Sequence, residues 1–281
     1  MCRYWRESII SAPESWTLIW PSLRLGLAAL CLERSKAALL ELDLDVYFVA
    51  QDLRIRDLIG PYIQNTGLLG FVKLTTTEDF TQTLPNFPQS MPSLRSLEII
   101  HSDDDELSHW DPSIDPFGPF SNTLRSLSLY DILLYPSSFL KLRTLTKLTL
   151  YYYKIHTPLD ALLDILEGNP LLKSVDLTID FEELPVHISQ PRIVTMDRLQ
   201  SLPITCWNAA VGRTLISNIP LRRGADLHIA IMGLGLNEIL SGIPTTHLQN
   251  LPSPTVTYFH EIPTLPSVYS TGWAEWILFI S

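Results

Sequence analysis

Cysteine is scarce in this 281-residue sequence, and long apolar runs are absent. The three cysteines (Cys2, Cys31 and Cys206) lie far apart without a CxxC pair, which argues against a disulfide framework or a zinc site and predicts reduced thiols. The longest apolar stretches, such as 27–32, fall short of the roughly 18 residues that a membrane-spanning helix needs. Glu7 stands where a secretory signal would begin its apolar segment. We therefore expect a cytoplasmic or nuclear protein that does not enter a membrane.

Basic residues are also few: 20 Lys and Arg stand against 30 Asp and Glu, giving a net charge of −10. A nucleic-acid binder needs a basic stripe that displaces counterions from phosphates, so we expect no nucleic-acid partner. Seven acidic residues and no basic residue lie between Ser96 and Pro119. Within it, the run Asp103, Asp104, Asp105 and Glu106 predicts a hydrated loop that would attract a basic segment of a partner. A hydrophobic fraction of 46% indicates a globular chain with a large core.

What the sequence does contain is a repeated six-residue frame, apolar-x-x-apolar-x-apolar. Its copies begin at Leu39, Leu69, Leu94, Leu124, Leu145, Leu172, Leu199 and, more weakly, Gly224, with Val256–Tyr258 as a possible ninth. The steps between copies range from 21 to 30 residues, close to the 20–29 residues of leucine-rich repeats. In an extended segment, the last two apolar positions of each frame point into one core.

The segments between the frames predict helices on the return path. Between Thr157 and Pro170, apolar residues recur at i, i+3, i+4 and i+7, which is typical of a helix. Thr157-Pro158 is a typical helix start, and Gly168 and Pro170 mark the helix end. Similar candidates are 23–34, 52–64, 209–217 and 236–240. Strand, helix and strand at this spacing predict an α/β fold: a leucine-rich-repeat solenoid with a curved parallel sheet and helices or irregular segments on its convex side. The alternative is an ordinary α/β domain, whose strands would be spaced less regularly.

The sequence divides into three parts on this basis. Residues 1–36 precede the repeats, and residues 37–243 contain about eight of them. In residues 244–281 prolines recur at 244, 252, 254, 263 and 266, so we expect an irregular C-terminal segment, a shortened repeat or a cap.

The first part resembles a known family. Cys2-x-x-Trp5-Arg6-x-x-Ile9, followed by Pro13 and Trp16, is similar to the last F-box helix and the turn after it in fungal, basidiomycete-type F-box proteins. Residues 32–36 look like the helix that opens the leucine-rich part of that family.

This resemblance implies the substrate-binding arm of an F-box receptor of a cullin-type ubiquitin ligase. It also implies a remnant of the adaptor-docking surface, formed by Cys2, Trp5, Arg6, Ile9, Pro13 and Trp16. The two earlier F-box helices, which carry most of the adaptor contact in the family, are not in this sequence. The alternative is therefore a free-standing leucine-rich scaffold without ligase docking. Trp5 and Trp16 would then simply cover the end of the core.

Catalytic signatures are missing from the sequence: there is no G-x-S-x-G, H-E-x-x-H, P-loop or kinase motif. We expect no cofactor and no metal, and we expect that the chain is not an enzyme. The third reading, a small-molecule enzyme, would require a deep polar pocket that the repeat does not predict.

The outward positions of the frame should form columns on the concave face of the sheet. Solenoid stability does not depend on these side chains, so they are available for recognition of a target protein. Binding energy concentrates in a few anchors, often aromatic. We select six as the partner-binding site: Glu98, Tyr130, Lys147, Tyr151, Asp176 and His228.

Overall fold

The computed structural model describes only part of the chain, and the statements below concern that part. The described residues are 3–19, 23–45, 58, 61–62, 66–74, 92–101, 108–109, 117, 121–130, 132–133, 139, 142–151, 159–179, 192–206, 209–222, 225–232, 255–261 and 273–279. They fall into two compact units, Met1–Thr144 (unit 1) and Leu145–Ser281 (unit 2). Each unit contains a parallel β-sheet and helices, so the expected α/β class is confirmed.

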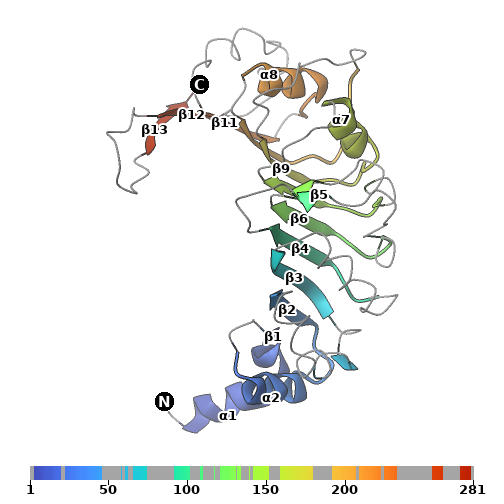
Figure 1. Cartoon of the computed structure of the whole chain (residues 1–281), viewed down its shortest axis with the longest axis vertical. Coiled ribbons are helices and arrows are strands. Elements are labelled where there is room, and N and C mark those ends of the chain that lie inside the picture. The colour runs from blue at the N-terminus through green and yellow to red at the C-terminus, as the bar shows by residue number, and fades with distance from the viewer. Residues whose placement is uncertain are drawn as a thin grey trace. The chain divides into compact units, whose positions relative to one another are not determined.

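Unit 1 starts with helices and continues as a sheet. Its first elements are α1 (Arg3–Ser11), the 3-10 helix η1 (Pro13–Trp16), β1 (Leu18–Ile19) and α2 (Leu25–Ser35). The further strands are β2 (Leu40–Asp45), β3 (Thr66–Leu74), β4 (Ser96–His101) and β6 (Ser126–Tyr130). Strands β1, β2, β3, β4 and β6 pair in that order and all run parallel, and α1 and α2 lie at the β1 end (Figure 1). A separate short parallel pair joins β5 (Ser108–His109) to β7 (Ile132–Leu133).

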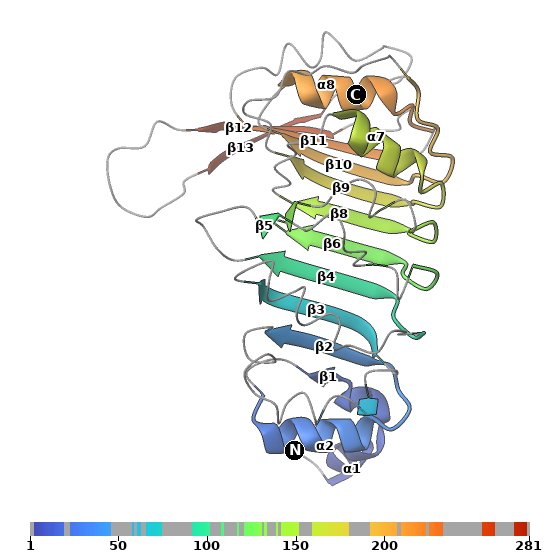
Figure 2. The ribbon, with the colours of Figure 1, turned by 45° about the vertical axis from the view of Figure 1, so that its right-hand side comes forward.

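Unit 2 contains a further series of strands and two described helices. Its elements are β8 (Lys147–Tyr151), α7 (Leu159–Glu167), β9 (Ser174–Ile179), β10 (Ser201–Cys206), α8 (Ala209–Asn218), β11 (Asp226–Met232), β12 (Thr255–Glu261) and β13 (Trp273–Phe279). Strands β8 to β12 pair in chain order and run parallel, and β13 pairs with β12 in the antiparallel direction. Helices α7 and α8 lie on one face of this sheet (Figure 2).

The apolar frame positions form the cores of both units, as the sequence predicts. In β6 and β9 the inward residues alternate with outward ones. The fully buried inward residues include Leu97, Ile99, Leu127, Leu129, Leu148, Leu150, Val175, Leu177, Leu202 and Ile204. Helix α7 buries six of its residues, among them Leu162 and Leu166. Removal of this apolar surface from water is the main favourable contribution to folding.

The first copy departs from the frame at its first position, whereas Leu42 at the second position is buried as expected. Leu39, expected at a buried first position, is 55% exposed, and Leu40 is buried in its place. The side chain of Leu39 lies against Gly67, where an added Cβ would stand 3.1 Å from the Leu39 Cβ. Glycine at position 67 thus allows the two strands to approach with Leu39 between them.

The expected helices agree with the structure where it describes them. Helices α2, α7 and α8 overlap the expected ranges 23–34, 157–170 and 209–217, and α2 and α8 each extend one residue further. The candidate at 236–240 and most of 52–64 lie outside the described residues, as does the acidic stretch 102–107.

The C-terminal part contains two strands. Strand β12 lies at Val256–Tyr258, the possible ninth frame, and β13 forms within the segment 244–281 for which we expected an irregular segment, a shortened repeat or a cap. The prolines at 252, 254, 263 and 266 fall outside these two strands. Proline therefore delimits the strands here, because it has no N–H to donate within a ladder.

Cys31 and Cys206 are free, buried thiols. Burial raises the pKa of the Cys206 thiol to about 12, and a backbone hydrogen bond from Gly212 offsets only part of this effect. Burial also raises the pKa of Cys31, with Arg34 acting in the opposite direction.

We expect iodoacetamide at pH 8 to leave Cys206 unmodified in the folded chain, because the thiolate is the reactive species. The same thiol should react once urea unfolds the chain. Mass spectrometry of the tryptic peptides measures both results. Modification of Cys206 at the same rate in the folded and the unfolded chain would contradict this assignment.

No helix within the described ranges is both long and apolar enough to cross a lipid bilayer.

Candidate functional site

The outward side of the unit 2 sheet, opposite its buried leucines, carries polar side chains on adjacent strands. We call this surface the outward face. It comprises Lys147, Thr149 and Tyr151 of β8; Ser174, Asp176 and Thr178 of β9; Ser201, Pro203 and Thr205 of β10; and Asp226, His228 and Ala230 of β11. The alternation of the strands places all of them on one side.

Three of the six predicted partner-binding residues come together on this face. Lys147 is opposite Ser174, so it lies diagonally from Asp176 on the neighbouring strand. His228 is opposite Pro203 of β10, which separates it from Asp176 by one strand. The charges of both Lys147 and His228 act on the Asp176 carboxyl. Lys147, Asp176 and His228 therefore form one polar cluster across four strands.

Pro203 interrupts the ladder inside this cluster. Between β9 and β10, Ser201 is opposite Ser174 and Ile204 is opposite Leu177, but no pair forms at Pro203. The proline nitrogen carries no hydrogen, and proline is normally confined to edge strands. Here it stands in an interior strand, between the strand of Asp176 and the strand of His228.

Asp176 is the electrostatically unusual residue of the cluster. Burial raises the pKa of its carboxyl above the ordinary 3.8, and the nearby charges of Lys147 and His228 act in the opposite direction without cancelling the effect. Within the described ranges, the carboxylate has no hydrogen bond and no ion pair beyond these two charge interactions. The folded chain thus holds a half-buried carboxylate at a position that disfavours its charge.

We expect Asp176→Asn to leave the melting temperature at pH 7 unchanged or to raise it. A pKa that is higher in the folded state means that the folded chain binds more protons, so the stability contribution of this carboxyl falls as the pH rises through and above 3.8. The difference between variant and wild type should shrink as the pH is lowered below 3.8, where the carboxyl is protonated in both states.

Thermal unfolding followed by circular dichroism at several pH values measures this difference. Asp226→Asn is the matched control, since it removes an exposed carboxylate from the same face. A clear loss of stability in Asp176→Asn at pH 7 would show that the carboxylate stabilises the fold.

The outward face is less open than the frame predicted. Thr149, Thr178 and Ala230 are buried although they point outward. Tyr151 is opposite Thr178 and remains half-buried. The long side chains of Lys147 and His228 remain exposed.

The other two predicted partner-binding residues belong to unit 1. Glu98 of β4 is opposite Ser128, and Tyr130 of β6 is opposite Ile100, so they lie on neighbouring strands, one outward position apart. Both are half-buried.

The residues that resemble the F-box remnant lie around α1. Cys2 and the side chain of Trp5 are outside the described part, Arg6 is exposed on α1, and Pro13 begins η1. Trp16 donates a hydrogen bond from Nε1 to the Ile9 carbonyl at 3.0 Å. The Arg34 guanidinium stands 4.6 Å from the centre of the Trp16 ring, which joins α2 to η1. Two of the six predicted residues, Ile9 and Trp16, are thus in direct contact.

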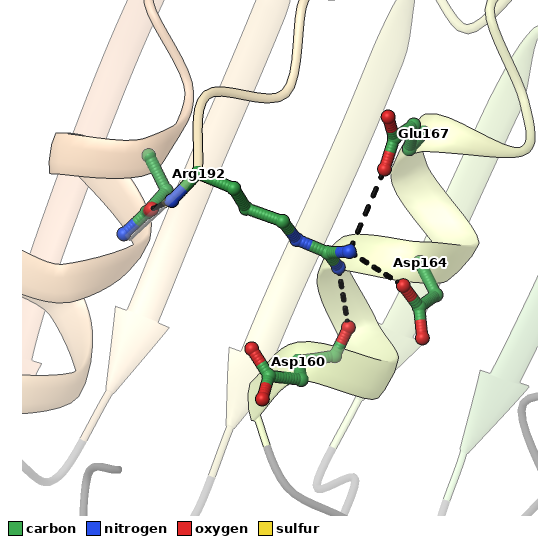
Figure 3. A network of polar contacts seen from close by, with 5 residues as sticks. Asp160, Asp164, Glu167 and Arg192 are labelled. Atoms are coloured by element: carbon green, nitrogen blue, oxygen red, sulfur yellow. Dashed lines mark hydrogen bonds and ion pairs between the residues drawn. The ribbon is translucent and has the colours of Figure 1, made fainter. Parts of the chain in front are cut away.

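A second polar cluster, which the frame did not predict, joins α7 to the segment before β10. Arg192 Nη1 donates to Asp164 Oδ1 at 2.6 Å and lies 3.5 Å from Glu167 Oε2, while Nη2 donates to the Asp160 carbonyl at 2.6 Å (Figure 3). The backbone N–H of Arg192 donates to Asn218 Oδ1 of α8 at 3.3 Å. A signal for it exists in the sequence, because the acids at 160, 164 and 167 lie on one side of a helix. We assign this cluster a structural role.

Comparison with known proteins adds no family: no family model matches the chain, and no curated protein matches it.

Proposed function

We propose that this chain is a leucine-rich-repeat recognition module whose outward face binds a target protein and which catalyses no reaction itself. The observation that carries the proposal is the convergence of two locally unfavourable features at one place on that face. Asp176 is a carboxyl whose charged form burial disfavours, and Pro203 breaks the adjoining ladder. Local features that cost stability are expected at functional sites.

The regularity of the chain supports the repeat assignment. Each of the nine frame copies coincides with a strand, and consecutive strands within each unit pair in parallel. A repeat protein presents an array of outward side chains along its sheet, and these arrays commonly bind other proteins.

The experiment compares how much partner protein is recovered with two variants of the chain. Each variant carries one threonine-to-arginine substitution, at a different position. Thr205→Arg introduces a long charged group on the outward face, where Thr205 is opposite Thr178 and Ala230. Thr195→Arg makes the same change at an exposed residue outside the strands. We expect Thr205→Arg to abolish recovery of the partner and Thr195→Arg to retain it. Equal recovery by both variants would exclude the outward face as the recognition surface.

We further propose that the module is the substrate-selecting arm of a cullin-type ubiquitin ligase receptor. The arrangement of α1, η1 and α2 supports this proposal, because it has the helix-then-turn form that the family resemblance implies. Tyr4, Ile9 and Ile10 of α1 are exposed apolar side chains that an adaptor could cover.

Co-expression with the adaptor subunit of a fungal cullin ligase tests the ligase proposal. Co-purification that is lost in Ile9→Asp would support docking through α1. Absence of the adaptor from the purified complex would favour the alternative, a free-standing leucine-rich scaffold.

A further inference from the structure

We propose that three turns of unit 1 form a surface that binds the carboxylate side chains of an acidic, extended segment of a partner protein. This surface, which we call the arginine edge, comprises Arg95, Arg125 and Arg143. The inference goes beyond the proposed function, because the arginine edge is separate from the outward face defined above.

Hydrogen bonds place the three turns side by side. The backbone N–H of Arg125 donates to the Arg95 carbonyl at 2.8 Å. The Thr144 hydroxyl donates to the Leu124 carbonyl at 2.7 Å, and Thr144 directly follows Arg143. The two arginines that precede β4 and β6 occupy the same position of the repeated frame, the second.

The arginine edge is accessible and basic. All three arginine side chains are exposed. The sequences of the turns, 92–95, 121–125 and 142–144, contain these three arginines and no acidic residue, in a chain whose net charge is −10. A local excess of one charge attracts groups of the opposite charge and increases their rate of association.

The guanidinium of Arg95 is held in place through one of its nitrogens. Nη1 donates to the Pro92 carbonyl at 3.1 Å and lies 3.5 Å from the carbonyls of Leu94 and Thr123. Among the described residues, none accepts a hydrogen bond from Nε or Nη2 of this arginine. These two N–H groups lie on the same side of the planar guanidinium, where they match the two oxygens of one carboxylate. Because the group is already oriented, less side-chain freedom is lost when a carboxylate binds.

Arg125 repeats this arrangement one strand further. Its Nη1 donates to the Thr144 carbonyl at 3.0 Å, in the turn that follows, as Nη1 of Arg95 approaches Thr123. Adjacent strands are about 4.8 Å apart, and alternate side chains of an extended peptide are about 7 Å apart on one side. Glutamates at alternate positions can therefore reach neighbouring arginines, since their flexible side chains take up the difference.

The test uses fluorescein-labelled peptides in which alanine alternates with glutamate, glutamine or phosphoserine. Fluorescence anisotropy with the full chain at low salt measures binding. We expect the glutamate peptide to bind in a saturable manner and the glutamine peptide not to bind. Arg95→Gln should weaken binding of the glutamate peptide about fivefold, the upper range for an exposed ion pair. Arg95→Lys should recover only part of this loss, because an ammonium keeps the charge but lacks the two coplanar donors.

Arg6→Gln is the matched control, since it removes the same charge from an exposed position of α1 in the same unit. It should bind the glutamate peptide as the wild type does. Arg143→Gln should weaken binding without disturbing the turns, because its guanidinium makes no hydrogen bond to any residue that the structure describes. This variant separates loss of binding from loss of structure.

The proposal is overturned if Arg95→Gln and Arg6→Gln weaken binding equally or if Arg143→Gln binds as the wild type does. It is also overturned if only the phosphoserine peptide binds, or if no peptide binds. Thr205→Arg should leave binding of the glutamate peptide unchanged. If the peptides fail while Thr205→Arg still abolishes partner recovery, the proposed function stands and the arginine edge is excluded as a binding surface.

Discussion

Replacing Leu177 by alanine should lower the free energy of unfolding of unit 2 by about 2–5 kcal/mol. Leu177 lies at the centre of β9, where it is fully buried, and its strand pairs with β8 on one side and with β10 on the other. The substitution removes the transfer free energy of the lost methyl and methylene groups and leaves a cavity that neighbouring strands fill only in part. A loss of this size is a large share of the stability of a typical domain.

Urea denaturation followed by circular dichroism measures the Leu177→Ala effect. An Ile→Ala pair within unit 2 supplies the control, since Ile204 is fully buried and Ile193 is 70% exposed. Ile204→Ala should cost about 2–5 kcal/mol, and Ile193→Ala should stay within about 0.5 kcal/mol of the wild type. Equal losses for the two isoleucines would contradict the assignment of the inward positions.

The strands could be predicted from the sequence because a burial requirement recurs at fixed positions. An apolar residue is required at each position that points into the core, as at Leu127, Leu148 and Leu202, which are fully buried. The first copy shows the limit of this reasoning: Leu39 and Leu40 are both leucines, and the sequence alone does not show that Leu40 is buried while Leu39 is exposed beside Gly67. Strand β13 was not predictable from the frame, because it runs antiparallel and does not continue the repeat.

The candidate site was predictable in part for the same reason. Lys147, Asp176 and His228 occupy outward positions of different frames, and the regular register of parallel strands aligns these positions. The sequence does not reveal that Asp176 is half-buried, nor that none of the described residues donates a hydrogen bond to it. The sequence also gives no reason why Pro203 is tolerated within an interior strand.

Arg192 is a residue that the frame could not identify. It lies outside every frame copy, and its role depends on where the turn before β10 meets α7. The guanidinium satisfies a helix carbonyl and a carboxylate at the same time, which a single planar fork can do. Its side chain is 28% exposed, so the attraction is screened less than at an open surface.

Arg192→Met should therefore destabilise unit 2 by about 1.5–3 kcal/mol, the range for hydrogen bonds that involve a charged group. Methionine retains much of the apolar stem, so the loss reports mainly on the polar contacts to Asp164 and the Asp160 carbonyl. Arg192→Lys should recover little of the stability, because an ammonium lacks the planar fork that reaches both acceptors together.

A matched control for Arg192 exists in the same unit. Arg222 Nη2 lies 2.6 Å from Asp197 Oδ1, the same distance as in the Arg192–Asp164 pair, but its side chain is 60% exposed. Arg222→Met should cost less than about 1 kcal/mol, as exposed ion pairs do. Urea denaturation of the three variants measures the difference. If Arg192→Met and Arg222→Met have equal effects, the contacts of Arg192 contribute no more than a surface pair, and α7 is held in place mainly by its buried apolar residues.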